Sequence, residues 1–280
     1  AVVRSSRIQE SAQLDPYVIP ALIDTITTDQ YQYKYLEETT YTNNSAPTAE
    51  GSALGENALA FTERTEEIRK IGAFIPMTEE LLADVSASQG YIDSRLRFMV
   101  RQTISDQIIG GSGSGVNLTG ILNKTGINSF NYSSFSGSLK RIGQLFEAIT
   151  EIQKDAFMNP DAIIMHPSDW YQVVTEVNAV TTSGALNPLF VGAGNFNDAV
   201  RPSIWGVPVV VSTETTAGDC IVGTFGGGQA IHIVARQGME VAMSDSHDEN
   251  FVKDIVVMKA TVRMGLPIYR ATAFAKISNF

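Results

Sequence analysis

Tyrosines alternate with other residues near the start of the chain, in the run "YQYKYLEETTY" at residues 31–41. Successive side chains of a strand point to opposite faces, so this pattern predicts a strand with its tyrosines on one face. A second alternating run contains Leu59 and Phe61, and a polar stretch at residues 43–57 separates the two runs. We therefore predict a long β-hairpin over residues 30–68.

A two-stranded hairpin is marginally stable alone in water, so its tyrosine face needs cover from other protein. The cover could come from the chain's own core or from another subunit, because tyrosine is enriched at subunit interfaces. The sequence leaves both alternatives open. The residues expected at a subunit interface are Tyr31, Tyr33, Tyr35, Tyr41, Leu59 and Phe61.

The segment before the hairpin, residues 1–29, is predicted to be an extended arm. Pro16 and Pro20 interrupt regular structure in "LDPYVIPALIDTITTD". A short apolar stripe follows from the spacing of Ile19, Leu22, Ile23 and Ile26. Like the hairpin, this stripe lacks cover within its own segment, and neighbouring subunits are expected to supply it.

Residues 69–118 contain a predicted long helix. Pro76 is expected to end a strand, and Thr78 is expected to cap a short helix. Beyond Gly90, apolar residues recur at helical spacing over about 30 Å. These residues are Ile92, Leu96, Met99, Val100, Ile104 and Ile108.

Glycine and serine follow this helix in "GGSGSGVNLTGILN", residues 110–123. A phosphate-binding loop needs a lysine and a hydroxyl directly after its second glycine, but Ile121 and Leu122 follow Gly120. The dinucleotide-binding glycine pattern also fails here. We instead predict a helix C-cap and a structural hinge, formed by Gly110, Gly111, Gly113 and Gly115. A second cluster, "GTFGGGQA", predicts a tight turn between strands.

Residues 119–236 change to a mixed α/β pattern. One helix is expected to pack Leu139, Ile142, Leu145, Phe146, Ile149 and Ile152 on one face. The run "DAIIMHPSDWYQVV" predicts a buried strand followed by a helix that starts at Pro167. Alternation returns in residues 237–280, where Gly265 is expected to let "LPIYRATAFAKI" complete a hairpin. Pairing of this tail with earlier strands would make a noncontiguous domain.

Composition limits the classes of function. The chain has 280 residues, of which 44% are hydrophobic, so it can bury a large core. Its net charge of −10 disfavours a protein whose main function is to bind nucleic-acid phosphates tightly. The single cysteine, Cys220, cannot form an internal disulfide, which favours a reducing compartment. No apolar stretch approaches a membrane span or the core of a signal peptide, so we expect a soluble protein.

The sequence gives little support for catalysis. The nucleophile elbow is missing, and the three histidines do not have zinc-ligand spacing. The acidic run "SDSHDENF" lacks the ordered spacing of a calcium loop and predicts a solvated turn. We therefore predict no catalytic, cofactor-binding or metal-binding residues. An α/β enzyme using His166 and Asp169 remains an alternative, although "HPSD" can simply link a strand to a helix.

The order of these parts resembles the HK97-like major capsid protein of tailed bacteriophages. The matching pieces include "VIPALIDTI", "IRKIGAFIPMTEELLADV", "SQGYIDSRLRFMVRQTISDQIIGGSGSG", "IIMHPSDWYQV", "IWGVPVVVS" and "VRMGLPIYRATAFAKI". The resemblance covers essentially the whole chain and implies an α+β capsid fold. Its parts would be an N-terminal arm at 1–29, an E-loop at 30–68 and an axial α/β domain at 119–236. The peripheral domain would combine a spine helix within 69–118 with returning strands at 237–280.

The resemblance also implies a function. Hexamers and pentamers would build an icosahedral shell around double-stranded DNA, in the virion, after assembly in the bacterial host cytoplasm. DNA binding would not be sequence-specific, and portal and decoration proteins would be possible partners. The acidic chain suits such a container, because a lining that does not bind phosphates tightly would let packaged DNA slide. No enzyme activity or membrane partner is implied. An encapsulin-type nanocompartment, which shares the fold and encloses cargo enzymes, is the nearest alternative.

Two finer expectations follow from the resemblance. Family members are often made with an N-terminal scaffolding segment that a protease removes, which would account for a chain starting at Ala1. Some relatives link their shells through an isopeptide bond between an E-loop lysine and an asparagine. Here no lysine occurs between Lys34 and Lys70, so we expect a shell without such crosslinks.

Overall fold

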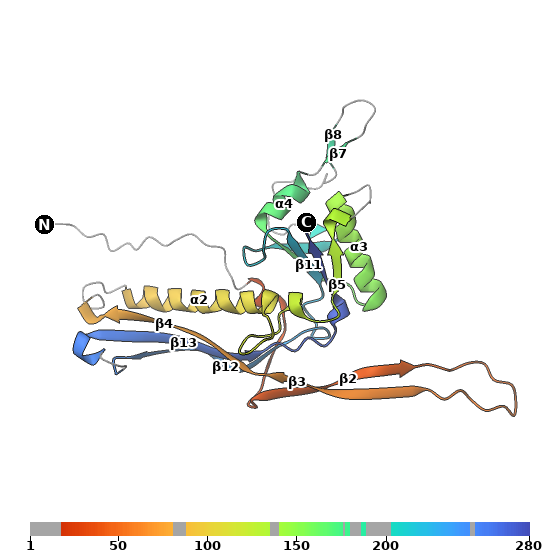
Figure 1. Ribbon diagram of the computed structural model, residues 1–280, viewed down its shortest axis with the longest axis horizontal. Coiled ribbons are helices and arrows are strands. Elements are labelled where there is room, and N and C mark those ends of the chain that lie inside the picture. The colour runs from red at the N-terminus through yellow and green to blue at the C-terminus, as the bar shows by residue number, and fades with distance from the viewer. Residues whose placement is uncertain are drawn as a thin grey trace.

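The computed structural model describes residues 18–80, 88–134, 140–175, 177–179, 186–188, 203–246 and 250–280. The described residues form a four-stranded sheet, a six-stranded sheet and two separate two-stranded pairs (Figure 1). A long helix, α2 (Ser88–Gly110), runs beside the four-stranded sheet. The hairpin of β2 (Gln32–Thr42) and β3 (Ala58–Glu67) reaches away from both sheets.

The four-stranded sheet joins segments from distant parts of the chain. Its order is β1-β12-β13-β4, in which β1 pairs in parallel with β12 and the other pairs are antiparallel. The strands are β1 (Thr25–Thr27), β12 (Ile233–Ser244), β13 (Ile255–Gly265) and β4 (Arg69–Thr78). The predicted noncontiguous pairing of the tail with an earlier segment is confirmed by the β13–β4 pair.

One face of this sheet packs on α2. The predicted alternation in β13 is confirmed, because its even-numbered residues from Val256 to Met264 are buried. The helix buries Leu96, Val100, Ile104 and Ile108, as its spacing predicted. Met99 is 41% exposed and does not belong to that buried face, and Ile92 is only partly buried.

Pro76 does not end a strand, contrary to expectation. β4 continues through Pro76 to Thr78, and Pro76 lies opposite Val257 of β13. Because β4 is an edge strand, it tolerates a proline, which lacks a backbone N–H. The short helix expected after Thr78 falls largely on residues 81–87, outside the described residues.

The six-stranded sheet has the order β5-β14-β11-β6-β10-β9. Its strands are β5 (Asn128–Asn131), β14 (Phe274–Ser278), β11 (Asp219–Gly223), β6 (Ala162–Met165), β10 (Val207–Val211) and β9 (Ser203–Ile204). Two helices accompany it, α3 (Lys140–Asp155) and α4 (Pro167–Val174). As predicted, β6 is buried throughout and Pro167 starts the following helix.

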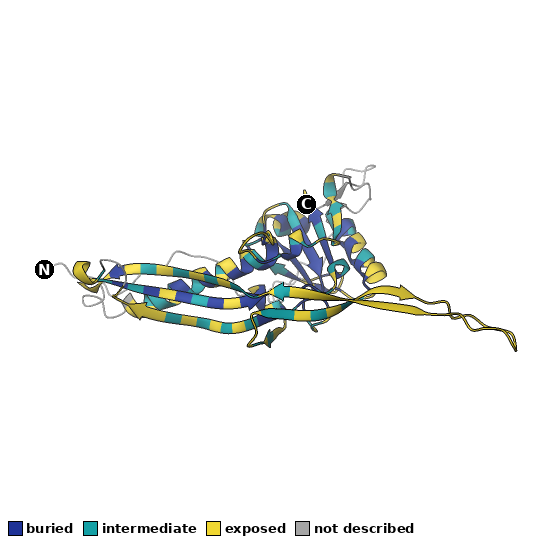
Figure 2. Ribbon diagram, turned by 60° about the horizontal axis from the view of Figure 1, so that its bottom comes forward, coloured by how far each residue is buried: buried dark blue, intermediate teal, exposed yellow. Residues whose placement is uncertain are grey.

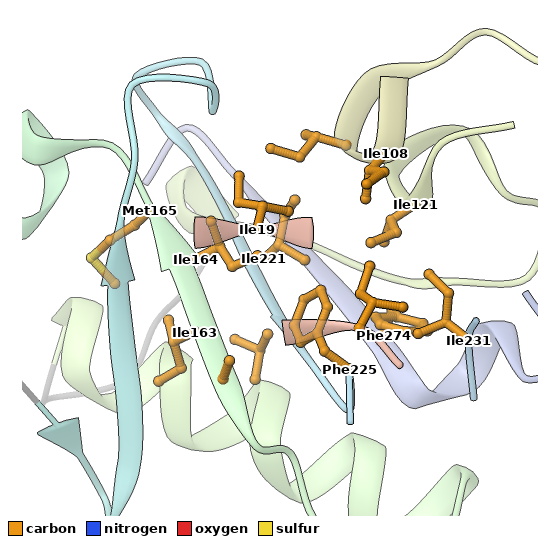
Figure 3. Close-up of a cluster of buried hydrophobic side chains, with 14 of the residues drawn as sticks. Ile19, Ile108, Ile121, Ile163, Ile164, Met165, Ile221, Phe225, Ile231 and Phe274 are labelled. Carbon is orange, nitrogen blue, oxygen red and sulfur yellow. The ribbon is translucent and has the colours of Figure 1, made fainter. Parts of the chain in front are cut away.

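The hydrophobic core continues from this sheet to the end of α2. Figure 3 shows Ile163 and Ile164 of β6 near Ile221 of β11, with Ile108 and Ile121 at the opposite side of the cluster. Buried residues of α3 include Ile142, Leu145, Ile149 and Ile152, as expected. Phe146 is an exception: it is half exposed, and its ring centroid lies 4.9 Å from that of Trp205. Leu139 lies outside the described residues.

The last strand crosses between the sheets. We expected residues after Gly265 to complete a hairpin with the preceding strand, and this expectation is wrong. β14 pairs with β11 and β5 in the six-stranded sheet, not with β13. β12 already begins at Ile233, so the expected boundary between residues 236 and 237 does not separate the two sheets.

The arm is also better covered than expected. Ile19 and Ile23 are buried within the chain's own core. Residues Thr25–Thr27 form β1 and pair with β12. The expectation that a neighbouring subunit covers this stripe is therefore wrong for Ile19 and Ile23, whereas Leu22 and Ile26 are only partly buried. Residues 1–17 lie outside the described residues.

Short elements complete the described chain. β7 (Val177–Ala179) pairs with β8 (Leu186–Pro188). The 3-10 helices are η2 (Pro20–Leu22), η3 (Ile121–Asn123), η4 (Tyr132–Ser134), η7 (Phe251–Lys253) and η8 (Ala271–Ala273). Over the residues that the structure describes, none of the helices could cross a membrane.

Candidate interaction surface on the hairpin

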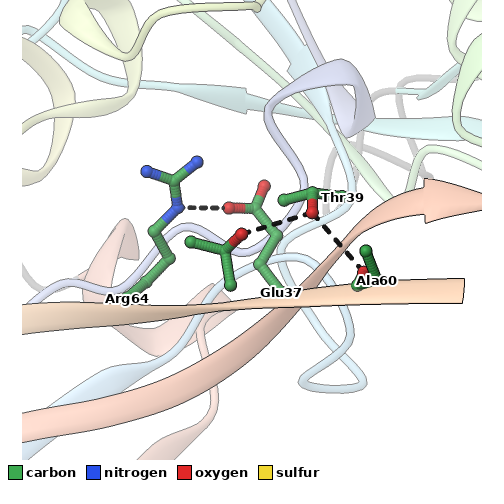
Figure 4. Close-up of polar contacts among 5 residues, drawn as sticks. Glu37, Thr39, Ala60 and Arg64 are labelled. Atoms are coloured by element: carbon green, nitrogen blue, oxygen red, sulfur yellow. Dashed lines mark hydrogen bonds and ion pairs between the residues drawn. The ribbon is translucent and has the colours of Figure 1, made fainter.

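The hairpin of β2 and β3 is an antiparallel pair in which Gln32 lies opposite Glu67 and Thr42 lies opposite Ala58. Two ion pairs cross it, Lys34–Glu63 at 2.6 Å and Arg64–Glu37 at 2.5 Å. Figure 4 shows the second pair beside Thr39, whose hydroxyl donates to the Ala60 carbonyl at 3.4 Å. Water and salt screen exposed ion pairs, so these contacts contribute little to stability and leave the hairpin marginal.

A β-bulge divides the hairpin into two halves. Glu38 lies opposite Phe61 but Thr40 lies opposite Ala60, so Thr39 is an extra residue in β2. An extra residue moves every later side chain of its strand to the other face. Tyr41 therefore shares a face with Leu59, whereas Tyr33 and Tyr35 are on the opposite face. The prediction that all the tyrosines share one face is wrong.

The part of the hairpin beyond Tyr35, on both sides of the bulge, carries an apolar surface that we call the outer stripe, defined as Leu36, Tyr41, Leu59 and Phe61. The strand register puts these four residues on one face, and the predicted alternation of Leu59 and Phe61 is confirmed. Their exposed fractions are 71%, 70%, 60% and 59%. Figure 2 shows exposed residues along this part of the ribbon. Apolar side chains this exposed and this close together are typical of an interaction site.

The root of the hairpin packs against the same chain. Tyr33 and Tyr35 are partly buried, and the Tyr35 ring meets Tyr269 edge-on with centroids 4.7 Å apart. Burial raises the pKa of Tyr35. Tyr31, by contrast, is 66% exposed. Of the six residues expected at a subunit interface, the structure thus leaves Tyr31, Tyr41, Leu59 and Phe61 exposed.

Glu66 also anchors the root. Burial raises the pKa of the Glu66 carboxyl, while Lys124 and a hydrogen bond from the backbone of Leu266 lower it in part. Gly265 sits close to this region, because a Cβ there would lie 3.4 Å from both the Glu66 side chain and the Glu67 carbonyl. The root is therefore attached to the chain at a polar contact as well as an aromatic one.

The glycine segment after α2 forms a compact loop instead of a left-handed C-cap at Gly110 or Gly111. Neither of these two residues has a positive φ, whereas Gly113 and Gly115 do. Asn123 closes the helix end by donating to the carbonyls of Gly110 and Gly111, at 2.9 and 3.1 Å. These contacts hold the loop in place, and movement at the predicted hinge stays a prediction.

The side chains of the enzyme alternative have structural roles. His166 caps α4 by accepting from the backbone N–H of Ser168. Asp169 is buried and accepts from the backbone N–H of Gly218 at 2.8 Å. Burial raises the pKa of the Cys220 thiol, which makes it a poor nucleophile. Within the described ranges no cluster of metal-ligating side chains occurs. Residues 247–249 of the acidic run lie outside them.

Sequence reasoning missed Tyr269 and Leu36. Tyr269 lies in an irregular segment after β13, where no periodic pattern indicates its partners. Leu36 lies among polar neighbours in "YLEE", and it joins the outer stripe because the bulge brings Tyr41 onto its face. A single apolar residue in a polar run gives no reliable sequence signal.

The family comparison covers nearly the whole chain. A model described as "Phage capsid family" matches residues 5–279. The major capsid protein of Enterobacteria phage HK97 is 27% identical over 243 residues, which are 87% of this chain and 60% of that protein. The chain thus spans about 60% of the length of this curated relative.

Solved structures share the fold. The capsid of a native GTA particle, computed with C5 symmetry, matches with a TM-score of 0.78 at 15% identity, covering 99% of this chain and 95% of that chain. A structure from Mycobacterium phage Bobi has a TM-score of 0.76 at 14% identity, with coverages of 99% and 95%. One from Mycobacterium phage Ogopogo has 0.72 at 18%, with 99% of each chain covered. The predicted α+β, HK97-like fold is confirmed.

Proposed function

The chain belongs to the phage capsid family, a family of structural proteins and not of enzymes, and from this premise we propose that its copies assemble into an icosahedral shell. Hexamers and pentamers would form the shell, which would enclose double-stranded phage DNA. Portal and decoration proteins are further proposed partners, and assembly would take place in the host cytoplasm. The proposed site of action is the hairpin surface, with no catalytic step.

The outer stripe is the observation that carries this proposal. A closed shell brings copies of one chain into repeated contact, so a surface left open in one copy is covered by the next. Full burial of a large apolar side chain contributes about 1.5–3 kcal/mol, so four such residues in each copy can support assembly. Part of this gain is offset by lost rotational and side-chain freedom on association.

The net charge of the chain supports a shell that encloses DNA without binding it tightly. Its net charge of −10 opposes tight binding to a phosphate backbone. DNA enclosed by such a protein can move during packaging and release, because few salt-dependent contacts hold it. The proposal therefore includes confinement of DNA without sequence-specific recognition.

Shell cohesion is proposed to be noncovalent. Lys34 is the sole lysine within residues 30–68, and it pairs with Glu63 at the inner half of the hairpin. That ion pair raises the pKa of Lys34, which favours the charged form over a nucleophilic amine. Removal of an N-terminal scaffolding segment is a separate proposal. Denaturing electrophoresis and intact mass measurement of purified particles test both, since crosslinked ladders or an unprocessed precursor would contradict them.

Electron microscopy of purified particles, with their nucleic-acid content, tests the function. We expect icosahedral shells for the wild-type chain and at least a tenfold lower particle yield for Phe61→Ser. The matched control is Thr62→Ser, which changes the adjacent residue on the opposite face and keeps its hydroxyl near Thr39. Shells filled with protein instead of DNA, or a stable monomer under all conditions, would overturn the proposal.

A further inference from the structure

An aromatic cluster joins the hairpin root to the segment that connects the two sheets. The Tyr269 hydroxyl donates to the Tyr33 hydroxyl at 3.3 Å, and the Tyr269 ring contacts Tyr35 edge-on at 4.7 Å. His232 flanks the other side, with its ring centroid 5.6 Å from that of Tyr269. Tyr269 therefore contacts two tyrosines of β2 at once.

Tyr269 stands on a well-fixed piece of backbone. Its N–H donates to the Ala230 carbonyl at 2.8 Å, and the His232 N–H donates to the Pro267 carbonyl at 3.3 Å. An isolated bridge between Ile231 and Ile268 lies between these bonds, and both of these side chains are buried. This segment thus gives the hairpin root a firm support.

A small rotation of the hairpin at its root produces a larger displacement at its far end. A strand rises about 3.3 Å per residue, so the stretch from Tyr35 to Thr42 extends about 23 Å beyond the aromatic contact. A rotation of about 10° at the root would therefore move its far end by about 4 Å. The outer stripe lies on this stretch and on the facing part of β3.

We propose that Tyr269 is the positioning residue of the hairpin: its ring and hydroxyl hold Tyr33 and Tyr35, and so fix the direction in which the outer stripe leaves its own subunit. This inference rests on the proposed function of the stripe. Glu66 and Glu67 also lie beside Gly265, where the same connecting segment begins. The direction of the hairpin is consequently coupled to the crossover between β13 and β14.

Distances between two spin labels test this inference directly. One label is placed on the hairpin at Thr40→Cys and the other on α3 at Glu147→Cys, both exposed positions. Cys220 is buried and does not compete for the label. Labelled chains are diluted among unlabelled chains, so that each measured distance lies within one copy. Particle yield is measured on the same variants without labels.

We expect Tyr269→Ala to widen the distance distribution at least twofold and to lower particle yield at least tenfold. Tyr269→Phe keeps the edge contact with Tyr35 but loses the hydrogen bond to Tyr33, so the width of its distribution should lie between those of the wild type and Tyr269→Ala. Tyr35→Ala removes the same contact without altering the connecting segment, and it should reproduce Tyr269→Ala even where that variant folds poorly. The matched control is Tyr31→Ala, which changes an exposed tyrosine and should leave the width of the distance distribution unchanged.

The outcomes separate the two proposals. An unchanged, narrow distribution in both Tyr269→Ala and Tyr35→Ala would overturn the positioning role, whatever the particle yield. Failure of the wild-type chain to form shells would overturn the proposed function, and the distance measurement on unassembled chains would still decide the positioning role.

Discussion

Tyr33 and Tyr269 lie 236 positions apart in the chain, yet their hydroxyl oxygens are 3.3 Å apart and share a hydrogen bond. This contact fastens the inner half of the hairpin to its own subunit. The bulge at Thr39 then places Tyr41 on the opposite face, together with the rest of the outer stripe. One hairpin thus has an anchored root and an open outer half, which is the arrangement that a protein needs to reach a neighbouring copy.

In the glycine segment after α2, alanine should be tolerated at Gly110 but should destabilise the fold at Gly111. A Cβ on Gly111 would lie 2.4 Å from the Leu118 carbonyl oxygen and 2.5 Å from that of Gln107. Because the crowding atoms belong to the backbone, Gly111→Ala should lower the free energy of unfolding by about 1–3 kcal/mol.

Gly110→Ala is the matched control for this prediction, since no atom beyond its chain neighbours and the backbone of its own helix lies within 4 Å of the added Cβ. Alanine is the better helix former there, so a gain of up to about 1 kcal/mol is expected. Urea denaturation of both variants measures the difference. Equal free energies of unfolding for the two variants would contradict the prediction and show that the loop is loosely packed.

Asp169 should act as a structural residue. Its carboxylate is buried and accepts the Gly218 N–H, so Asp169→Ala leaves a partly buried donor without its partner and should destabilise the fold by about 1–3 kcal/mol. Asp155→Ala, at an exposed position on α3, should change stability by about 0.5 kcal/mol or less. Thermal unfolding of both variants checks this. A destabilisation of similar size in each would contradict the assigned role.

Stability should fall as pH rises toward neutrality because of Glu214. Burial and the neighbouring Asp106 carboxyl raise the pKa of Glu214 to about 7 from its ordinary value of 4.5. Between these values the folded chain binds more protons than the unfolded chain, so this contribution is present at low pH and lost as pH rises through about 7. Partial solvent exposure limits the effect to about 1 kcal/mol.

Unfolding of wild type and Glu214→Gln across pH 4 to 9 measures this linkage. The glutamine variant cannot lose a proton, so its stability should decline less over the same interval. A parallel decline in both proteins would assign the pH dependence to other groups.

DNA binding by unassembled capsomers should be weak. A chain with a net charge of −10 that makes few phosphate contacts should show a shallow dependence of affinity on salt. Fluorescence anisotropy with a DNA duplex at several salt concentrations measures both quantities. Tight binding with a steep salt slope would contradict the loose confinement that we propose.

Local patterns in the sequence predicted most elements correctly. The helical spacing of Leu96, Val100, Ile104 and Ile108 and the alternation in β13 each reflect one buried face, which periodicity reports directly. The β2–β3 hairpin and the buried strand β6 are predicted for the same reason. Pro76 was misjudged because a proline's effect depends on whether its strand is at a sheet edge, which is a tertiary property.

Other features have no local signal. The bulge at Thr39 adds one residue to an otherwise regular alternation, and this single insertion reverses the face of Tyr41. The crossing of β14 into the six-stranded sheet, and with it the position of Tyr269, depends on pairing with distant strands. The exposed outer stripe was therefore partly predictable in its residues, but its face and its anchoring root were not.

A structure of the assembled particle, determined by electron cryomicroscopy, tests the central claim most directly. The measured quantity is the exposed fraction of Tyr41 and Phe61, which is 70% and 59% in the single chain. We predict that both side chains become buried against a neighbouring copy at every position in the shell. Particles in which both remain as exposed as in the single chain would contradict the account.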